Sequence, residues 1–446
     1  LLHEYGEGVP KDEAKANALY RKAAELGDPI GALFLALNAY HGIGMAVDDA
    51  EMARWSRKAA DGGEPRGMHL LGVAYDSGRG VAEDDAEALR WFRRCAALGT
   101  AACERSLGIM YQYGRGVAAD QAVAYRHYRA AADKGDGAAQ GDVGDAYRWG
   151  RGVAKDPKEA LAWYGKADRN GDMHSVAMLG AMYENGEGVA ADPAKAVAYY
   201  RRAAAAEAPL GMYYLGTVYR SGTGVPKDVA TAVLWIRKAA EAGEYEAMND
   251  LGYAYEFGEG APQDMAQAVA WYRRAAEEGG VELAFANLGT MYANGRGVER
   301  DLAEAVRLYR KGMEMGSARA AYLLGLAYAE GEGVPKNEKE ALRLIRDAAD
   351  KGELDAITEL GVLMEEGIGT AKNLTKANAF YRQAAAKGDA RAMRFLGINY
   401  ANGIGVEADA AEAKAWLRKA IEAGDDQAGD LLRGLEGRRS APAAVS

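Results

Sequence analysis

Histidine and cysteine are scarce in this chain of 446 residues, with five and two copies. Proline occurs only ten times and 27% of the residues are charged, a composition that suits short packed helices rather than disorder. No run of eighteen apolar residues is present, so we expect no transmembrane helix. The net charge of −10 gives no support for nucleic-acid binding.

Sequence motifs for metal binding, nucleotide binding and catalysis are also missing. The histidines stand at different registers, and no pair of them has metal-ligand spacing. None of the Gly-x-Gly tripeptides continues into Gly-Lys-Ser/Thr, and no Gly-x-Ser-x-Gly nucleophile elbow occurs. We therefore predict a protein that is not an enzyme and that has no metal and no cofactor.

Glycine, in contrast, is abundant and regularly placed. The tripeptide Gly-x-Gly occurs twelve times, and each step is 36 residues except one of 37. The first glycines are Gly6, Gly42, Gly78, Gly114, Gly150, Gly186, Gly222, Gly258, Gly295, Gly331, Gly367 and Gly403. A fixed period of this size predicts a solenoid in which one small unit stacks on copies of itself.

Each copy reads as two helices joined by the glycine turn. In the copy over residues 65–99, a short helix A spans about 66–77 and ends at Gly78, and Asp84 opens helix B. An Asp or Asn stands six residues after the first glycine in all twelve copies. We interpret this position as a helix N-cap and not as a catalytic array of carboxylates.

Helix B carries a large residue thirteen positions after the first glycine, and six of the seven tryptophans stand there. We expect these rings, including that of Trp235, to pack in the core. The arginines two positions further on, as in Arg57, Arg93 and Arg237, are expected on the solvated outer face.

The string L-G-x-x-Y-x-x-G-x-G-V, followed by the capping Asp and A-x-x-W-Y-R-K-A-A, resembles the Sel1-like repeat, a relative of the tetratricopeptide repeat. Instances are LGVAYDSGRGV from Leu71, LGIMYQYGRGV from Leu107 and LGTVYRSGTGV from Leu215. The resemblance covers about residues 1–424. It implies an all-α fold, a right-handed α/α superhelical solenoid of helix pairs with a 36-residue period.

The register predicts four parts in the chain. They are a partial N-terminal repeat (1–27), eleven repeats in one continuous solenoid (28–424), a C-terminal capping helix (425–436) and a disordered tail (437–446). Because the chain begins with Leu1, near the end of an expected helix A, we expect its natural sequence to extend further at the N-terminus.

Variation between copies on helix A predicts the binding residues. Positions three before, one after and five after the helix-A glycine share one helical face, which by resemblance to tetratricopeptide solenoids lines a concave groove. Aromatic residues stand there where sister copies have Ser, Asn or Glu, and aromatic side chains are typical binding hot spots. Packing of these rings between adjacent turns is the alternative. The predicted partner-binding residues are Tyr113, Arg148, Trp149, Tyr213, Tyr253, Phe257 and Tyr322.

The resemblance implies an adaptor that binds a protein or peptide, with no nucleic acid, no membrane insertion and a monomeric state. A bacterial periplasmic or secreted location is favoured by the resemblance, with the cytoplasm left open. Certain cysteine-rich members bind or hydrolyse cell-wall peptides or β-lactams, which is the alternative function. Those members bridge consecutive helices with the spacing of Cys95 and Cys103. Here both cysteines stand one residue earlier in the register, so a disulfide and two buried alanine substitutes both stay open.

Overall fold

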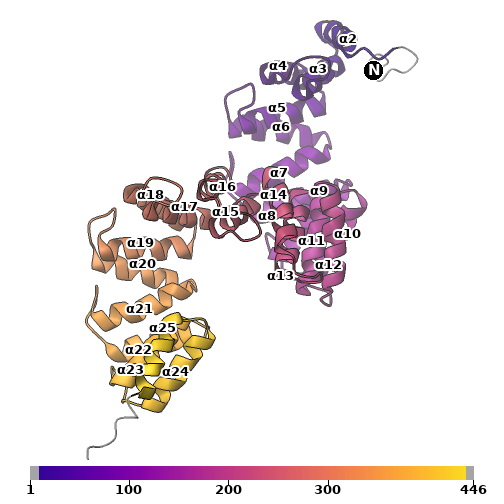
Figure 1. Ribbon diagram of the computed structural model, residues 1–446. Helices are drawn as coiled ribbons and strands as arrows, with labels where there is room; N and C mark the ends of the chain where they lie inside the picture. The colour runs from indigo at the N-terminus through magenta and orange to yellow at the C-terminus, as the bar shows by residue number, and fades with distance from the viewer. Residues whose placement is uncertain (1–9, 438–446) are drawn as a thin grey trace, which may run out of the picture. The chain divides into compact units, whose positions relative to one another are not determined.

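The computed structural model describes residues 10–437, and every regular element within them is an α-helix (Figure 1). The chain divides into two compact units at the boundary between Lys227 and Asp228. We call residues 10–227 the N-terminal unit and residues 228–437 the C-terminal unit. The glycine turn at Gly6 and residues 438–446 of the predicted tail (437–446) lie outside the described residues, whereas Gly437 is the last residue of α25.

Twelve helices belong to each unit. Those of the N-terminal unit are α2 (Glu13–Glu25), α3 (Pro29–His41), α4 (Asp49–Asp61), α5 (Pro65–Ser77), α6 (Asp85–Ala97), α7 (Ala101–Tyr113), α8 (Gln121–Asp133), α9 (Gly137–Trp149), α10 (Pro157–Arg169), α11 (Met173–Asn185), α12 (Pro193–Ala205) and α13 (Pro209–Ser221). Those of the C-terminal unit are α14 (Val229–Glu241), α15 (Tyr245–Phe257), α16 (Met265–Glu277), α17 (Glu282–Asn294), α18 (Leu302–Glu314), α19 (Ala318–Glu330), α20 (Glu338–Asp350), α21 (Leu354–Glu366), α22 (Leu374–Ala385), α23 (Ala390–Asn402), α24 (Ala410–Glu422) and α25 (Asp426–Gly437).

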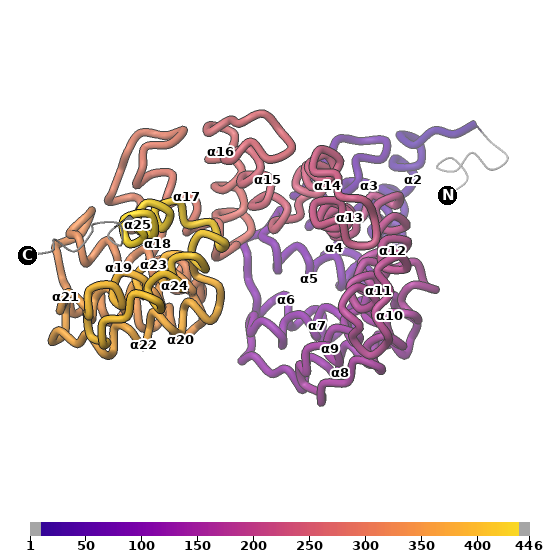
Figure 2. Tube along the Cα trace, turned by 60° about the horizontal axis from the view of Figure 1, so that its bottom comes forward, coloured from indigo at the N-terminus to yellow at the C-terminus, as the bar shows by residue number. Residues whose placement is uncertain are grey.

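The odd-numbered helices α3 to α23 are the helices A of the repeats, and the even-numbered helices α2 to α24 are the helices B. Within each unit every helix packs against the next along the chain, as the tube in Figure 2 lets the reader follow. The prediction of an all-α solenoid built from repeated helix pairs is confirmed. Because each helix lies against the next within a unit, the core of each unit lies between neighbouring helices.

Glycine and Asx residues set the helix ends as the repeat register predicts. In all eleven helices A from α3 to α23, the first glycine of Gly-x-Gly is the C-cap in left-handed conformation; Gly78, for example, has φ 66°. In all twelve helices B from α2 to α24, the predicted Asp or Asn side chain accepts a backbone N–H of the first turn. Asp84 Oδ1, for example, accepts from Glu87 at 3.0 Å. The capping interpretation is confirmed.

The turn after helix B also contains a residue with positive φ. This residue is usually glycine, but in one repeat it is Glu207. Gly171 has φ 83° after α10 and Gly243 has φ 96° after α14. Glu207, after α12, has φ 56° and is the one non-glycine residue with positive φ in residues 10–437. In the repeat of 37 residues, the corresponding turn is lengthened and contains Gly280 at φ 64°.

The residue fourteen positions after the first glycine packs against the helix-A glycine in the core. The ring of Phe92 lies against Gly72, where a side chain on Gly72 would come within 2.4 Å of it. Tyrosines take the same place in later repeats, such as Tyr128 against Gly108. The glycine of L-G-x-x-Y therefore makes room for a ring from helix B.

The tryptophans at the thirteenth position differ in burial. Trp55, Trp91 and Trp163 are buried, whereas Trp235 is half-buried. Trp235 is therefore less buried than the sequence led us to expect. One face of its ring lies beside Lys238, whose Nζ is 4.7 Å from the ring centroid.

The arginines that follow these large residues are not simply solvated, as the sequence led us to expect. Arg237 donates a hydrogen bond to the hydroxyl of Tyr255 at 2.8 Å, and Arg93 donates to that of Tyr111 at 2.9 Å. In each case the acceptor is the tyrosine of L-G-x-x-Y in the following repeat. These contacts connect consecutive repeats near the surface of the solenoid.

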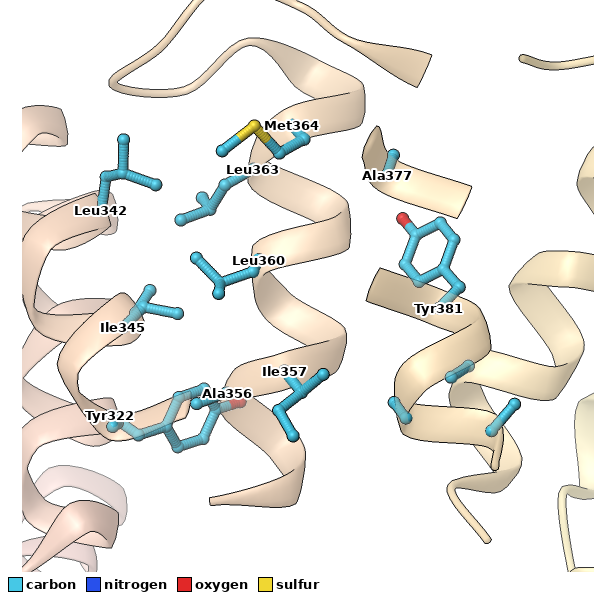
Figure 3. Close-up of a cluster of buried hydrophobic side chains, with 14 of the residues drawn as sticks. Tyr322, Leu342, Ile345, Ala356, Ile357, Leu360, Leu363, Met364, Ala377 and Tyr381 are labelled. Atoms are coloured by element: carbon cyan, nitrogen blue, oxygen red, sulfur yellow. The ribbon is translucent and has the colours of Figure 1, made fainter. Parts of the chain in front are cut away.

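Figure 3 shows how a helix A holds two neighbouring helices in the C-terminal unit. Leu360 and Leu363 of α21 point toward Ile345 and Leu342 of α20, and Tyr381 of α22 lies on the other side of α21. Tyr322 of α19 belongs to the same buried cluster. The helix A α21 therefore buries one face against the preceding repeat and another against its own helix B, α22.

Candidate partner-binding face

The predicted site residues divide into an exposed and a buried group. Tyr113 and Trp149 are 67% and 50% exposed in the N-terminal unit, and Tyr253 and Phe257 are 43% and 54% exposed in the C-terminal unit. Tyr213 is half-buried. The structure therefore places four of the predicted aromatic side chains at the surface of helices A.

Tyr322 and Arg148 belong to the buried group, for different reasons. Only 5% of Tyr322 is exposed, since its ring packs into the hydrophobic cluster of Figure 3. Arg148 donates to both carboxylate oxygens of Glu187, at 2.7 and 2.8 Å, and holds the pKa of that carboxyl below its usual value. Its guanidinium also lies over the indole of Trp149, 4.7 Å from the ring centroid. Arg148 thus contacts both Glu187 and the ring of Trp149.

Tyr253 and Phe257 form an aromatic pair on α15. Their ring centroids are 4.5 Å apart and the rings are inclined by 40°. The two residues are four positions apart in one helix, so they stand on the same face one turn apart. The guanidinium carbon of Arg296 lies 5.9 Å from the Phe257 centroid. These rings form a compact apolar patch with a cation at its edge.

A cavity of about 330 Å³ opens on the helix-A face of the N-terminal unit. Its walls come from three consecutive helices A, namely α7, α9 and α11, and from the helix B α8. Tyr113 lines it, and α9 contributes Ala138, Gly141 and Ala146 together with the acidic residues Asp142 and Asp145. Because Ala138 and Gly141 carry almost no side chain, the surface is hollowed beside them.

Charged side chains inside this cavity are mostly paired within the chain. Arg105 Nε donates to Asp142 Oδ2 at 2.5 Å, and burial raises the pKa of Asp142 although Arg105 opposes the shift. Asp145 accepts the hydroxyl of Tyr164. Arg151 also lines the cavity, and in residues 10–437 its guanidinium has neither a hydrogen-bond partner nor an ion-pair partner.

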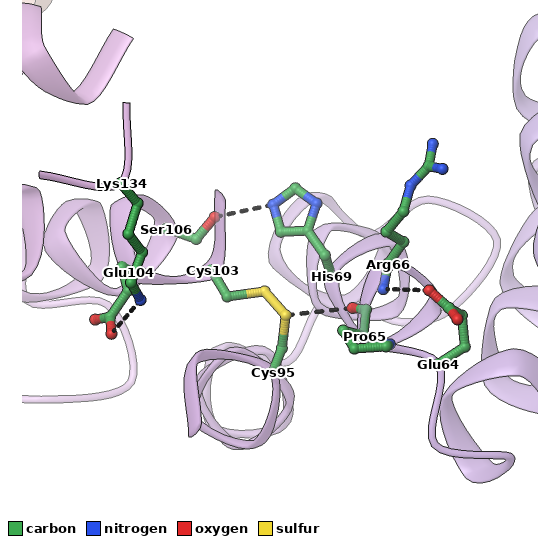
Figure 4. The surroundings of a disulfide bond; sticks show 9 residues. All are labelled: Glu64, Pro65, Arg66, His69, Cys95, Cys103, Glu104, Ser106 and Lys134. Carbon is green, nitrogen blue, oxygen red and sulfur yellow. Dashed lines mark hydrogen bonds and ion pairs between the residues drawn. A yellow bond between two sulfur atoms is a disulfide. The ribbon is translucent and has the colours of Figure 1, made fainter. Parts of the chain in front are cut away.

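The two cysteines lie between α6 and α7 and are joined by a disulfide, with their Cα atoms 5.9 Å apart (Figure 4). Both are fully buried. Close by, Nε2 of His69 and Oγ of Ser106 are 3.2 Å apart, and burial lowers the pKa of His69. Sequence reasoning did not identify this hydroxyl–imidazole pair, because its members stand in different repeats.

The cavity was also missed, although a signal for it exists in the register of the repeats. Gly141 stands at the position where the preceding helices A carry His69 and Arg105. Gln112 stands where the preceding repeat carries Asp76. A comparison of copies for missing side chains and missing charges would have pointed to these two consecutive repeats.

The stacked helix pairs with glycine-ended helices A and Asx-capped helices B define a helical repeat solenoid of the tetratricopeptide-like class. Twelve matches to the Sel1 repeat family model cover the chain almost completely, and the chain belongs to the Sel1 repeat family. The matched residues are 1–28, 29–64, 65–100, 101–136, 137–172, 174–207, 209–244, 246–280, 284–317, 318–353, 354–389 and 390–425. No curated protein matches the chain.

Solved structures similar to this chain include other Sel1 repeat proteins. A protective antigen of uropathogenic Escherichia coli strains, which displays an SLR fold, is 32% identical over 95% of this chain and 91% of its own, with a TM-score of 0.55. A Sel1 repeat protein from Oxalobacter formigenes is 32% identical over 70% of this chain and 90% of its own, with a TM-score of 0.47. Solenoids of this kind commonly serve as scaffolds for protein–protein interactions and are typically not catalytic. None of the helices within residues 10–437 is long and apolar enough to cross a bilayer.

Proposed function

We propose that this protein is a scaffold that binds a polypeptide partner on the face formed by its helices A. The observation that carries the proposal is the exposure of Tyr113 and Trp149 at register positions where sister helices carry small polar residues such as Ser77 and Asn185. Burial of large exposed aromatic side chains on binding contributes favourable free energy, and such side chains dominate protein interfaces.

In the N-terminal unit, the surroundings of Tyr113 and Trp149 support this proposal. Tyr113 lines the 330 Å³ cavity, and the ring of Trp149 lies against the buried side chain of Arg148, which is paired with Glu187. An anchor whose orientation is already fixed loses little side-chain entropy when a partner binds. Tyr253 and Phe257 supply a second, separate anchor in the C-terminal unit.

Affinity capture of the partner from the organism's own cells, followed by quantitative mass spectrometry, tests the proposal. Trp149→Ala and Tyr113→Ala should each reduce recovery of a defined partner while leaving the melting temperature nearly unchanged. Leu234→Ala is the matched control, because Leu234 is an equally exposed apolar residue (60%) on a helix B. Equal recovery by all variants would refute the helix-A face as the binding surface.

We also propose that the chain carries out no hydrolysis of β-lactams or cell-wall peptides. The Ser106–His69 pair is the arrangement closest to a nucleophile and a base, and in residues 10–437 no group hydrogen-bonds the other ring nitrogen of His69 to orient it. A nitrocefin turnover assay on purified protein tests this point. A rate that Ser106→Ala abolishes would establish the enzymatic alternative.

A further inference from the structure

Four of the Gly-x-Gly turns in residues 10–437 have an arginine between the two glycines, and three of these arginines pair with an acidic residue of the preceding repeat. Arg115 pairs with Asp76 at 2.9 Å, and Arg296 pairs with Glu256 at the same distance. In both cases the acid stands four residues after the helix-A glycine of the repeat before. Arg79 instead pairs with Asp49, the first residue of the preceding helix B, at 2.7 Å. The fold thus offers two places from which a carboxylate reaches this arginine.

At Arg151 both of those places are occupied by neutral amides. Gln112 stands at the register of Asp76, and Gln121 stands at the register of Asp49. Both glutamines line the 330 Å³ cavity together with Arg151. Gln112 is already used, since its Oε1 accepts the hydroxyl of Tyr128 at 2.8 Å, and Gln121 donates to the backbone oxygen of Gln112 at 2.9 Å. The arginine therefore keeps its charge at the edge of a cavity without the carboxylate that its counterparts have.

In the C-terminal unit, the corresponding arginine is paired with a carboxylate. Glu256 accepts the hydroxyl of Tyr272 on one oxygen, at 2.6 Å, and pairs with Arg296 on the other, at 2.9 Å. Replacing this glutamate by glutamine, as the chain does at residue 112, preserves the tyrosine contact and frees the arginine. At the fourth position after the helix-A glycine, the two repeats differ by one acidic group, Gln112 against Glu256.

We propose that the cavity lined by α7, α8, α9 and α11 binds an acidic side chain, Asp or Glu, of the polypeptide partner, whose carboxylate takes the place of the missing acid beside Arg151. This inference rests on the proposed scaffold function and names the chemistry of the bound segment. A charge-assisted hydrogen bond from arginine to carboxylate is the strongest contact that this cavity offers. The volume lies at the low end of the range for ligand pockets, which suits one side chain rather than a large ligand.

Small probes test the site without knowledge of the partner. The acidic probe is N-acetylglutamate α-amide, and its neutral counterpart is N-acetylglutamine α-amide. Saturation-transfer NMR should give a dissociation constant on the order of millimolar for the acidic probe, and binding at least about tenfold weaker for the neutral one. Arg151→Gln should abolish the difference between the two probes.

Gln112→Glu is the sharpest variant, because it rebuilds the Glu256 arrangement. It should fold as stably as the natural protein and should lose affinity for the acidic probe about tenfold, since the chain now supplies its own carboxylate. Arg296→Gln is the matched control, because it removes an arginine that is already paired, and it should leave probe binding unchanged. Equal binding of the two probes, or full affinity in Gln112→Glu, would overturn the proposal.

Two further probes test whether the cavity prefers another kind of anion to the carboxylate of an acidic side chain. N-acetylglycine presents a terminal carboxylate, and inorganic phosphate presents a phosphoryl group. Tighter binding of either one than of N-acetylglutamate α-amide would overturn the assignment to an acidic side chain. If binding of a partner is lost in Trp149→Ala but not in Arg151→Gln, the cavity assignment fails and the scaffold function stands. If the acidic probe binds but no partner loses affinity in Trp149→Ala, the cavity assignment stands and the scaffold function fails.

Discussion

The ring of Phe92 occupies the space that a side chain on Gly72 would need. A Cβ atom on Gly72 would lie 2.4 Å from Cε1 of Phe92, well inside van der Waals contact. Gly72→Ala should therefore destabilise the N-terminal unit by about 1–3 kcal/mol, the usual cost of overpacking a core, in spite of alanine's better helix propensity. The free energy of unfolding in urea measures the change.

Gly165→Ala is the control for that substitution. Gly165 also lies inside a helix, α10, but a Cβ there would meet only the tip of Arg169, at 4.0 Å. Alanine should therefore stabilise at this position by roughly 0.5–1 kcal/mol. Equal effects of the two substitutions would show that propensity, and not the ring of Phe92, decides the outcome at Gly72.

Glu207 holds a backbone conformation that the other repeats leave to glycine. Its φ of 56° is costly for a residue with a Cβ, and the equivalent Gly171 has open space around it. Glu207→Gly should stabilise the N-terminal unit by about 0.5–1 kcal/mol, because relief of strain exceeds the added entropy of the unfolded chain. Thermal melting measures this, and Gly171→Glu should shift the melting temperature in the opposite direction.

Glu244 predicts a pH dependence of stability in the C-terminal unit. Burial, with the hydrogen bond and charge of Glu246, raises the pKa of Glu244 from 4.5 to about 8. In the unfolded chain this carboxyl ionises near its ordinary value, so between pH 4.5 and about 8 the unfolded state has lost the proton that the folded state retains. Stability should therefore fall as pH rises through this window. Urea unfolding followed from pH 4.5 to 8.5 should show the decline in the natural protein and a smaller one in Glu244→Gln.

The hydrogen bond from Arg237 to Tyr255 predicts coupling between consecutive repeats. Arg237→Ala, Tyr255→Phe and the double substitution form a thermodynamic cycle, and the coupling free energy should be about 0.5–1 kcal/mol for a partly exposed contact. The single substitutions should each lower the urea midpoint. A coupling of zero would mean that the two side chains meet without stabilising the junction.

Local signals made much of the fold predictable from the sequence. Gly78 and Asp84 act on their own backbone or on the turn beside them, so their roles follow from residue type and register alone. Contacts between repeats did not follow in this way. Arg237 was expected in solvent because its partner stands eighteen residues further along the chain, in the next helix A.

The solvent exposure of each predicted site residue also could not be predicted from the sequence. Tyr253 and Tyr322 both lie on the predicted face, yet the first is 43% exposed and the second 5%. The difference depends on the surroundings of each ring: Tyr322 packs into a cluster with Ile345 and Ile357, whereas Tyr253 contacts the inclined ring of Phe257 at the surface. Periodicity predicts which helical face a side chain occupies, but the neighbouring repeat decides whether that face is covered.

The recurring arginine–tyrosine hydrogen bonds have a consequence for how such a chain can change in length. Since Arg93 and Arg237 reach the same tyrosine position of the following repeat, a duplicated 36-residue segment would present its arginine to one neighbour and its tyrosine to the other. Both new junctions would then carry the arginine–tyrosine pair without any new substitution, if the copied repeat contains both residues. A feature confined to one repeat, such as Gln112, would be copied or lost together with that repeat.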